Sequence, residues 1–205
     1  MITLQDAINH LYDLAVHKGK PQSPSRLKVL ADYCIQELGL RGVHGARADQ
    51  DIPGGGRPKT WDIAWHHQGK HRLAISLKSI LKNLAGTVPN RIDDLMGEAA
   101  NAQLYSPEIV IGYVMILDVS SDAYSAKHGS TWSDLLRSRL SRLSGRCPPA
   151  WTIGTVEAFA YAEVDFSESP VLRPSTTSFE SFFDVLAEQV RLRNPSAFPD
   201  GPTVP

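Results

Sequence analysis

Apolar residues recur at helical spacing in several stretches of the chain and predict its helices. Residues three and four positions apart fall on one face of an α-helix, so an apolar set at this spacing packs against a core. Five stretches show the pattern: residues 4–16, 23–39, 90–105, 131–143 and 178–192. Thr131 is a suitable N-cap for the fourth helix, and Gly39 is a suitable stop for the second.

Other stretches carry strand patterns. Residues 61–67 are rich in aromatic and β-prone types, and residues 72–81 alternate apolar with other residues. Residues 109–119 are apolar nearly throughout, which is typical of a central strand covered on both faces. Within residues 151–166, small apolar residues alternate with larger or charged ones, so we expect the small face to lie under a helix. The order of elements predicts an α/β sandwich.

The remaining segments are expected to connect these elements. We predict one domain over residues 1–193 and a flexible tail over residues 194–205, which are rich in proline and polar residues. Residues 41–59 have little hydrophobic periodicity and are predicted to form a long loop. Its glycines at 54–56, with Arg57 and Lys59, suit a close approach of backbone amides and cations to a phosphate, although a flexible spacer is the alternative.

The two strands around residue 69 place charged residues in segments that otherwise look buried. Gln68-Gly69-Lys70 is a turn signal, which predicts an antiparallel hairpin. A loop of three or five residues would set Asp62 opposite Ser76 or Lys78, whereas a two-residue loop would put them on different faces; we predict the odd loop. A lone buried charge costs several kcal/mol, roughly, so Asp62 and Lys78 are expected to meet at a functional edge.

This hairpin resembles the active-site core of the PD-(D/E)xK nuclease superfamily, to which most type II restriction endonucleases belong. In that family an acid begins one strand, and an acid-x-Lys triplet lies on its antiparallel neighbour. Asp62 matches the first acid, and Ser76-Leu77-Lys78 matches the triplet. The chain departs from the pattern at Trp61, where proline is common, and at Ser76, which replaces the triplet acid and removes a metal ligand. The motif covers the hairpin and at most the following helix.

The helix predicted over residues 90–105 offers a replacement for the missing acid. Some restriction enzymes of this superfamily carry serine at the same position and supply a carboxylate from the next helix. Asp94 and Glu98 are the candidates, and Glu98 is favoured because glutamate reaches farther from a helix. The alternative for Asp94 is an i,i+3 ion pair with Arg91. For Glu37, near the end of the second predicted helix, two interpretations stay open: an additional acid close to the metals, or a solvated surface residue.

The resemblance implies a mixed central β-sheet flanked by helices and a Mg²⁺-dependent endonuclease. Such an enzyme hydrolyses phosphodiester bonds in double-stranded DNA and leaves 5′-phosphate and 3′-hydroxyl ends. Asp62 and Glu98, helped by Asp94 and the Leu77 carbonyl, would hold one or two Mg²⁺ ions. Lys78 would hold or deprotonate the attacking water, and Ser76 would orient water or a neighbour.

Similarity to restriction enzymes further implies sequence-specific cleavage, a homodimer and a cognate DNA methyltransferase in the same restriction system. Five cationic residues are candidates for DNA contact: Arg47, Arg57, Lys59, Lys82 and Arg91. Two other functions stay open. One is a less specific repair or phage-defence nuclease. The other is a catalytically inactive nucleic-acid-binding or assembly module of the same fold, in which the change at Ser76 ended catalysis.

Composition bears on how the protein would bind DNA and on the compartment in which it would work. The 205 residues carry a formal net charge of −1, so any DNA binding must come from local cationic patches. Cys34 and Cys147 are not spaced as a zinc pair, which favours reduced thiols in a cytoplasm. The sequence has neither a basic-then-apolar start nor an apolar run long enough for a bilayer, so we expect a cytoplasmic protein without a membrane partner. The sequence lacks the P-loop motif of an ATPase and the Gly-x-Ser-x-Gly motif of a serine hydrolase, so it supports neither of these two functions.

Overall fold

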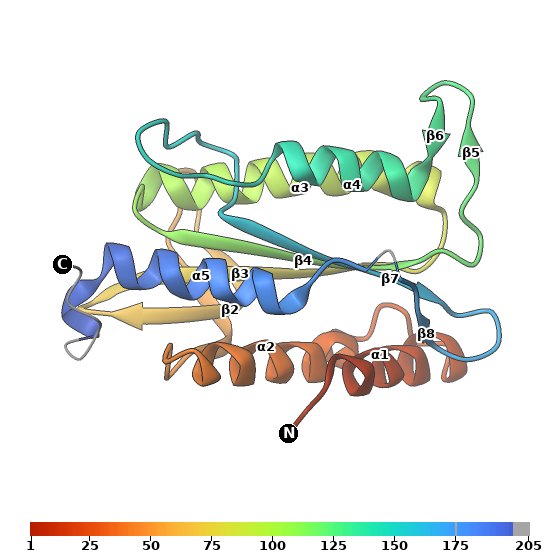
Figure 1. Ribbon diagram of the computed structural model, residues 1–205, viewed down its shortest axis with the longest axis horizontal. Helices are drawn as coiled ribbons and strands as arrows, with labels where there is room; N and C mark the ends of the chain where they lie inside the picture. Colours follow the sequence, from red (N-terminus) through yellow and green to blue (C-terminus); the bar gives the residue numbers. More distant parts are fainter. Residues whose placement is uncertain (175, 199–205) are drawn as a thin grey trace.

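The fold is built on a six-stranded mixed β-sheet with helices on both faces (Figure 1). The structure is a computed structural model that describes residues 1–174 and 176–198. In spatial order the strands are β1 (Arg47–Ile52), β2 (Lys59–His67), β3 (Lys70–Ile80), β4 (Val110–Asp118), β7 (Ala158–Asp165) and β8 (Val171–Leu172). The three central strands β3, β4 and β7 are parallel, and the outer pairings are antiparallel. The predicted α/β fold with a mixed sheet between helices is confirmed.

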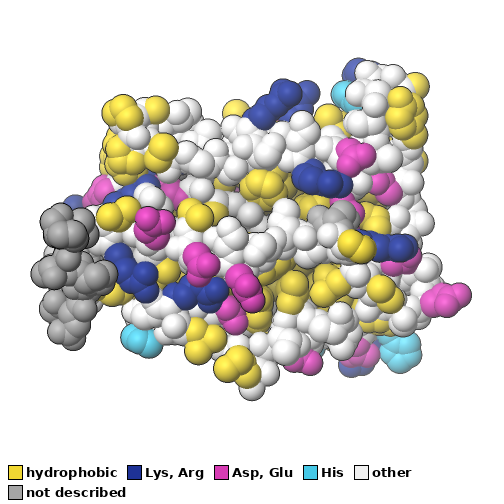
Figure 2. Space-filling view, in the orientation of Figure 1, with side chains coloured by type: hydrophobic (Ala, Val, Ile, Leu, Met, Phe, Trp, Pro, Cys, Tyr) yellow, Lys and Arg dark blue, Asp and Glu magenta, His cyan; other side chains and the backbone are white. Residues whose placement is uncertain are grey.

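Two helical layers bury the two faces of this sheet. One layer contains α1 (Leu4–Tyr12), the π-helical turn η1 (Asp13–His17), the 3₁₀ turn η2 (Pro24–Leu27), α2 (Lys28–Leu40) and α5 (Phe179–Arg193). The other contains α3 (Leu84–Tyr105) and α4 (Trp132–Arg142). On the side of the molecule that carries α5, acidic and basic side chains are interspersed on the surface (Figure 2). None of the helices in the described ranges is long and apolar enough to cross a membrane.

Local sequence signals account for most element boundaries. Thr131 caps α4 by accepting a hydrogen bond from the Asp134 amide at 3.2 Å, as predicted. All nine residues of β4 are buried, as expected for a central strand between two helical layers. Ala160 and its small neighbours on β7 belong to the same core cluster as Phe182 and Leu186 of α5, which confirms the predicted helix over that face.

Helix α3 begins at Leu84, earlier than the predicted residue 90. The segment before residue 90, which ends in Pro89, is expected from the sequence to be a short connection to this helix. Asn83 instead caps the helix with a left-handed backbone and accepts a hydrogen bond from the Gly86 amide at 3.3 Å. Pro89 lies within the second turn, where its missing N–H removes a hydrogen bond close to the helix start rather than in the middle. The early start lengthens the helix that carries Glu98.

Four strands are absent from the sequence expectations. The predicted loop over residues 41–59 contains β1, an edge strand in which Ile52 is the buried residue and the others are polar or partly exposed. An edge strand with one buried side chain leaves no alternation to detect. The predicted polar connection after residue 121 contains the first strand of a hairpin formed by β5 (Tyr124–Ser125) and β6 (Ser130–Thr131). The two-residue strand β8 was also missed.

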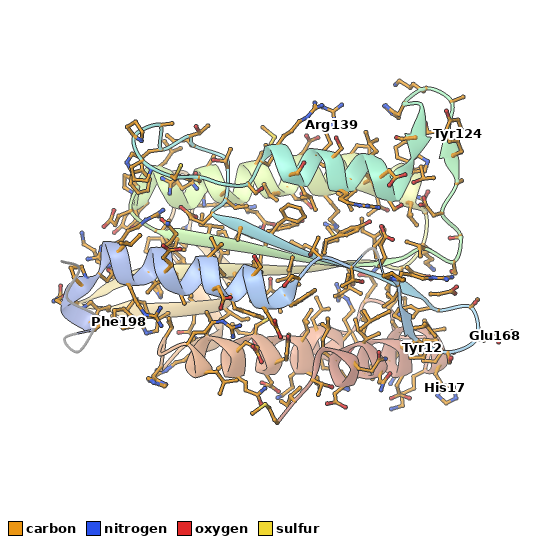
Figure 3. All side chains as sticks on the ribbon, viewed as in Figure 1. Tyr12, His17, Tyr124, Arg139, Glu168 and Phe198 are labelled. Carbon is orange, nitrogen blue, oxygen red and sulfur yellow. The ribbon has the colours of Figure 1, made fainter. Side chains whose placement is uncertain are left out.

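The first part of the predicted flexible tail is packed. Asn194 is buried and donates a hydrogen bond from Nδ2 to the Val190 carbonyl at 2.9 Å. It is followed by the 3₁₀ turn η3 (Pro195–Ala197). Phe198, labelled in Figure 3, places its ring centroid 5.9 Å from that of Trp65 on β2. The rest of the predicted tail, residues 199–205, lies outside the described residues.

Candidate active site

The β2–β3 hairpin brings Asp62 to Leu77, the middle residue of the triplet, but not by the predicted loop. His67 pairs with Lys70, so the loop has two residues, and both adopt the positive φ of a tight hairpin turn. The prediction of a loop with three or five residues was wrong. The pairing moves from Trp65↔Leu73 to His66↔His71, which leaves Arg72 as an extra residue on β3. This bulge restores the alternation that a two-residue loop would otherwise have reversed.

Asp62 lies where β2 and β3 separate. The pairing of the two strands ends at Ile63↔Ile75, and beyond it Asp62 accepts a hydrogen bond at Oδ2 from the Leu77 amide at 2.7 Å. The carboxylate therefore satisfies an amide that has lost its partner in the β-ladder. Asp62 also borders a hollow of about 350 Å³ lined by Leu77, Asp49 and residues at the start of α2.

Glu98 meets the β3 triplet from α3. Its Oε2 accepts a hydrogen bond from the Ser76 hydroxyl at 3.1 Å, and its Oε1 lies 3.3 Å from Lys78 Nζ. Lys59, the first residue of β2, forms a second ion pair with the same Oε1. Only 11% of the Glu98 side chain is exposed, and Ser76 is 2% exposed. Glu98, which the sequence favoured as the third acid, is thus held by two strands at once.

Burial and the charges of Lys78, Glu98 and Asp49 affect the pKa of Asp62. Burial raises the pKa of Asp62 above its ordinary value, the Leu77 hydrogen bond and Lys78 oppose the rise in pKa, and the charges of Glu98 and Asp49 add to it. The negative charge of Glu98 therefore acts on Asp62 and disfavours the charged form of that carboxyl group. A cation between them would relieve that repulsion.

Tyr113 forms part of the buried floor beside the triplet. It is paired with Ser76 across β3 and β4, and its hydroxyl donates a hydrogen bond to the Arg91 carbonyl at 3.4 Å. Burial is the main cause that raises the pKa of Tyr113, and the nearby charge of Glu98 adds to the increase. Tyr113 could not be singled out from the sequence, because residues 109–119 are apolar nearly throughout.

The other predicted acids do not join the group. Asp94 forms an ion pair with Arg91 Nη1 at 2.5 Å, which is the alternative that the sequence left open. Glu37 is paired with Arg41 at 2.7 Å, and Arg41 also binds Asp184 of α5 at 2.6 Å. Glu37 and Arg41 therefore join α2 to α5 rather than contributing to the site.

The candidate DNA contacts divide into paired and exposed residues. Lys59 is bound to Glu98 and Arg91 to Asp94, whereas Arg47, Arg57 and Lys82 are exposed. Lys82 and Arg91 line a hollow of about 430 Å³ together with Arg26, which the sequence analysis did not single out. Burial lowers the pKa of Arg26, the charge of Arg91 lowers it further, and the charge of Asp62 opposes both.

The glycine-rich loop does not offer its amides to a ligand. The Gly56 amide donates to Asn101 Oδ1 at 2.9 Å, and the Arg57 amide donates to the same atom at 3.4 Å. The Gly55 amide donates to the Asn101 backbone carbonyl at 2.8 Å. The predicted phosphate cradle is therefore occupied by α3. A hollow of about 400 Å³ remains between the loop and the helix, lined by Arg57, Lys59, Glu98 and their neighbours.

The donors for a metal ion are few. In residues 1–174 and 176–198, no group of three or more His, Cys, Asp or Glu side chains is placed to hold a metal ion. Asp62 and Glu98 are two hard oxygen donors on separate elements, and each is hydrogen-bonded to a residue of the β3 triplet, Asp62 to the Leu77 amide and Glu98 to the Ser76 hydroxyl. None of the protein-family models, curated proteins or solved structures compared with this chain matches it.

Proposed function

We propose that the protein is a metal-dependent DNA endonuclease of the PD-(D/E)xK type. The observation that carries the proposal is the meeting of Glu98 from α3 with Ser76 and Lys78 of the triplet on β3. Asp62 of β2 bonds the middle residue of that same triplet. An acid on one strand, a lysine on the next and a helix-borne acid in place of the triplet acid are the parts that this chemistry needs.

The donor set suits Mg²⁺, which prefers carboxylate and carbonyl oxygens and keeps several waters. Asp62 and Glu98 would hold the ion, with the Leu77 carbonyl as a further ligand. Bound there, Mg²⁺ would polarise the scissile phosphate and make a nearby water more acidic. Asp94 would act only after leaving Arg91, so it is the weaker candidate.

The remaining side chains have tasks set by their contacts. Lys78 holds the attacking water or takes its proton, and its charge counters the negative charge that develops on the phosphate. Ser76 holds Glu98 through its hydroxyl and so fixes the direction of one carboxylate. Glu98 Oε1 is paired with the ammonium groups of Lys59 and Lys78, so Glu98 would hold the ion in competition with both.

Sequence-specific cleavage is the finer part of the proposal. We propose double-stranded DNA as the substrate, a homodimer that cuts both strands and a cognate methyltransferase that protects the host DNA. Arg47, Arg57 and Lys82 supply exposed charge for the substrate. A cytoplasmic location follows from a role in restriction.

A second function is favoured by a separate observation. Both oxygens of Glu98 are already bound, by Ser76 on one side and by two lysines on the other. With the triplet acid replaced by serine, this arrangement also suits an inactive module that binds nucleic acid without cutting it. A less specific nuclease of repair or phage defence would share the active site but not the base-reading contacts.

A plasmid assay separates these functions. Wild-type protein, Asp62→Asn and Lys78→Met are incubated with supercoiled plasmid and either Mg²⁺ or a chelator. Discrete Mg²⁺-dependent fragments from wild type alone indicate a sequence-specific enzyme, and a smear indicates a nonspecific one. DNA binding without cleavage by any of the three proteins indicates the inactive module. Equal cleavage by all three contradicts the assigned active site.

A further inference from the structure

Asn101 fastens the glycine-rich loop, residues 53–58, to helix α3. Its side chain accepts hydrogen bonds from the Gly56 and Arg57 amides and donates one from Nδ2 to the Arg57 carbonyl at 2.9 Å. Its backbone carbonyl accepts a further hydrogen bond from the Gly55 amide at 2.8 Å. One residue of α3 therefore binds the loop through both its side chain and its backbone.

The loop lies so close to α3 that side chains would not fit. A Cβ added to Gly54 would lie 2.0 Å from Asn101 Nδ2 and 2.5 Å from the Arg57 carbonyl oxygen. A Cβ added to Gly55 would lie 2.7 Å from the Leu104 Cβ. Glycine is required at both positions because the backbone touches the helix directly. These two glycines would make the loop highly flexible if it were detached from α3. The clamp, which is the set of hydrogen bonds from Asn101 to the loop, therefore has a large effect on the order of the loop.

The clamp ends next to Lys59. Pro58 alone separates the bonded part of the loop from Lys59, whose ammonium group pairs with Glu98. Glu98 and Asn101 are three residues apart on α3 and therefore share a face of the helix. The hydrogen bonds of Asn101 and the ion pair of Lys59 thus join the same loop to the same side of α3, one helical turn apart.

We infer that Asn101 is a positioning residue that holds Lys59 at Glu98 and thereby completes the site with a second lysine. The inference rests on the proposed nuclease function for its catalytic consequence. Asn101 touches neither metal nor DNA in this scheme. It acts through the loop, which leads directly into Lys59 at the start of β2, and the Lys59 ammonium pairs with a carboxylate that Lys78 also contacts.

The test is a double-mutant cycle between Asn101→Ala and Lys59→Met with two measurements. The first needs no activity: proton exchange of the Lys59 ammonium with water is followed by ¹H–¹⁵N NMR. We expect this exchange to be slow in the wild-type protein, since a hydrogen-bonded ammonium exchanges slowly. In Asn101→Ala we expect the Lys59 ammonium to exchange about as fast as the ammonium of Lys127, which is exposed. The second is the Mg²⁺-dependent plasmid cleavage rate, expected to fall about 10-fold or more in Asn101→Ala and no further when Lys59→Met is added.

Two further variants make the result specific. Gly54→Ala disturbs the clamp from the loop side without changing α3, and it is expected to release Lys59 as Asn101→Ala does. Asn90→Ala is the matched control, because Asn90 lies on the same helix and bonds the Gly86 carbonyl at 3.2 Å; it is expected to change neither measurement.

Some results would overturn the inference. It fails if the Lys59 ammonium stays protected in both Asn101→Ala and Gly54→Ala, or if the rate losses of Asn101→Ala and Lys59→Met add. A wild-type protein that does not cleave DNA refutes the nuclease function, while the ammonium exchange still decides whether Asn101 positions Lys59.

Discussion

Asp62 is a residue whose charge costs the folded protein stability. Burial is the largest influence on its pKa and raises that pKa above the ordinary 3.8. The folded state therefore binds the proton more tightly than the unfolded state. The stability that this provides is fully present below pH 3.8 and is lost as the pH rises through the higher folded pKa. Such a cost is typical of a carboxylate kept for function.

Replacing Asp62 by Asn is therefore expected to stabilise the protein at pH 7. The amide oxygen of Asn can still accept the Leu77 hydrogen bond, and no buried charge remains. We expect a higher Tm for Asp62→Asn than for wild type at pH 7, with the difference shrinking as the pH falls toward 3.8. Thermal unfolding followed by circular dichroism across this range measures it.

Asp6 provides a control of opposite sign. The Thr3 hydroxyl and amide lower the pKa of Asp6 in the capping box of α1, so Asp6→Asn is expected to lower Tm at pH 7. An Asp62→Asn protein that is less stable than wild type at pH 7 would contradict the electrostatic account of Asp62.

At the scale of single residues, the sequence predicts what alternation and helical reach determine. Asp62, Ser76, Lys78 and Glu98 follow from the period of a strand and the length of a glutamate side chain. The pairing of Lys59 with Glu98 and the hydrogen bonds of Asn101 do not. They depend on how a loop folds back onto a helix distant in sequence, and nothing local encodes that contact.

At the scale of elements, a buried ion-pair network fixes the start of β4 to the end of α5. Glu157 binds Arg146 at 2.9 Å and Arg193 at 2.8 Å, and its Oε2 accepts a hydrogen bond from the Ile111 amide at 2.6 Å. The Glu157 side chain has no exposed surface. Removing its charge would leave two buried guanidinium groups without their acid.

Glu157→Ala is expected to lower the free energy of unfolding by about 3–5 kcal/mol, the usual effect of breaking a buried ion pair. Urea unfolding of both proteins measures the change. Asp32→Ala is the control, since it breaks the exposed Asp32–Lys28 pair and is expected to cost about 0.5 kcal/mol or less. Similar losses of unfolding free energy in the two variants would mean that the ion-pair network around Glu157 does not stabilise the fold more than an exposed pair does.

Elements that bury a periodic face were predicted, and those that do not were missed. The five helices and the buried strands β4 and β7 follow from hydrophobic spacing. Edge strand β1 buries Ile52 alone, so its pattern is that of a loop. The bulge at Arg72 likewise has no recognisable signal in the sequence. It nevertheless decides which residues of β3, Lys78 among them, share a face of the sheet with a given residue of β2.

At the scale of the whole molecule, the charge is nearly balanced. The formal net charge is −1, and the face in Figure 2 mixes both signs. DNA binding would therefore depend on a few cations near the site, among them the exposed Arg57 and Lys82. Arg139, which points outward from α4 in Figure 3, serves as a comparison outside the proposed contact surface.

We expect DNA affinity to fall steeply with salt. Changing Arg57 and Lys82 together to Ala is expected to reduce the slope of log affinity against log salt by about 2, one unit for each lost phosphate contact. Arg139→Ala is expected to leave the slope as in wild type. Fluorescence anisotropy with a labelled duplex, measured without Mg²⁺, gives both slopes. Equal slopes for all three proteins would exclude Arg57 and Lys82 from the DNA contact.

In the proposed active site, Glu98 takes the place of the triplet acid and would hold Mg²⁺. The most direct test compares the single-turnover plasmid cleavage rates of wild type, Glu98→Gln and Asp94→Asn, which change two acids one turn apart on α3. We expect a loss of about 100-fold or more for Glu98→Gln and a rate close to wild type for Asp94→Asn. Glu98→Gln protein that cleaves as fast as wild type would contradict this role of Glu98.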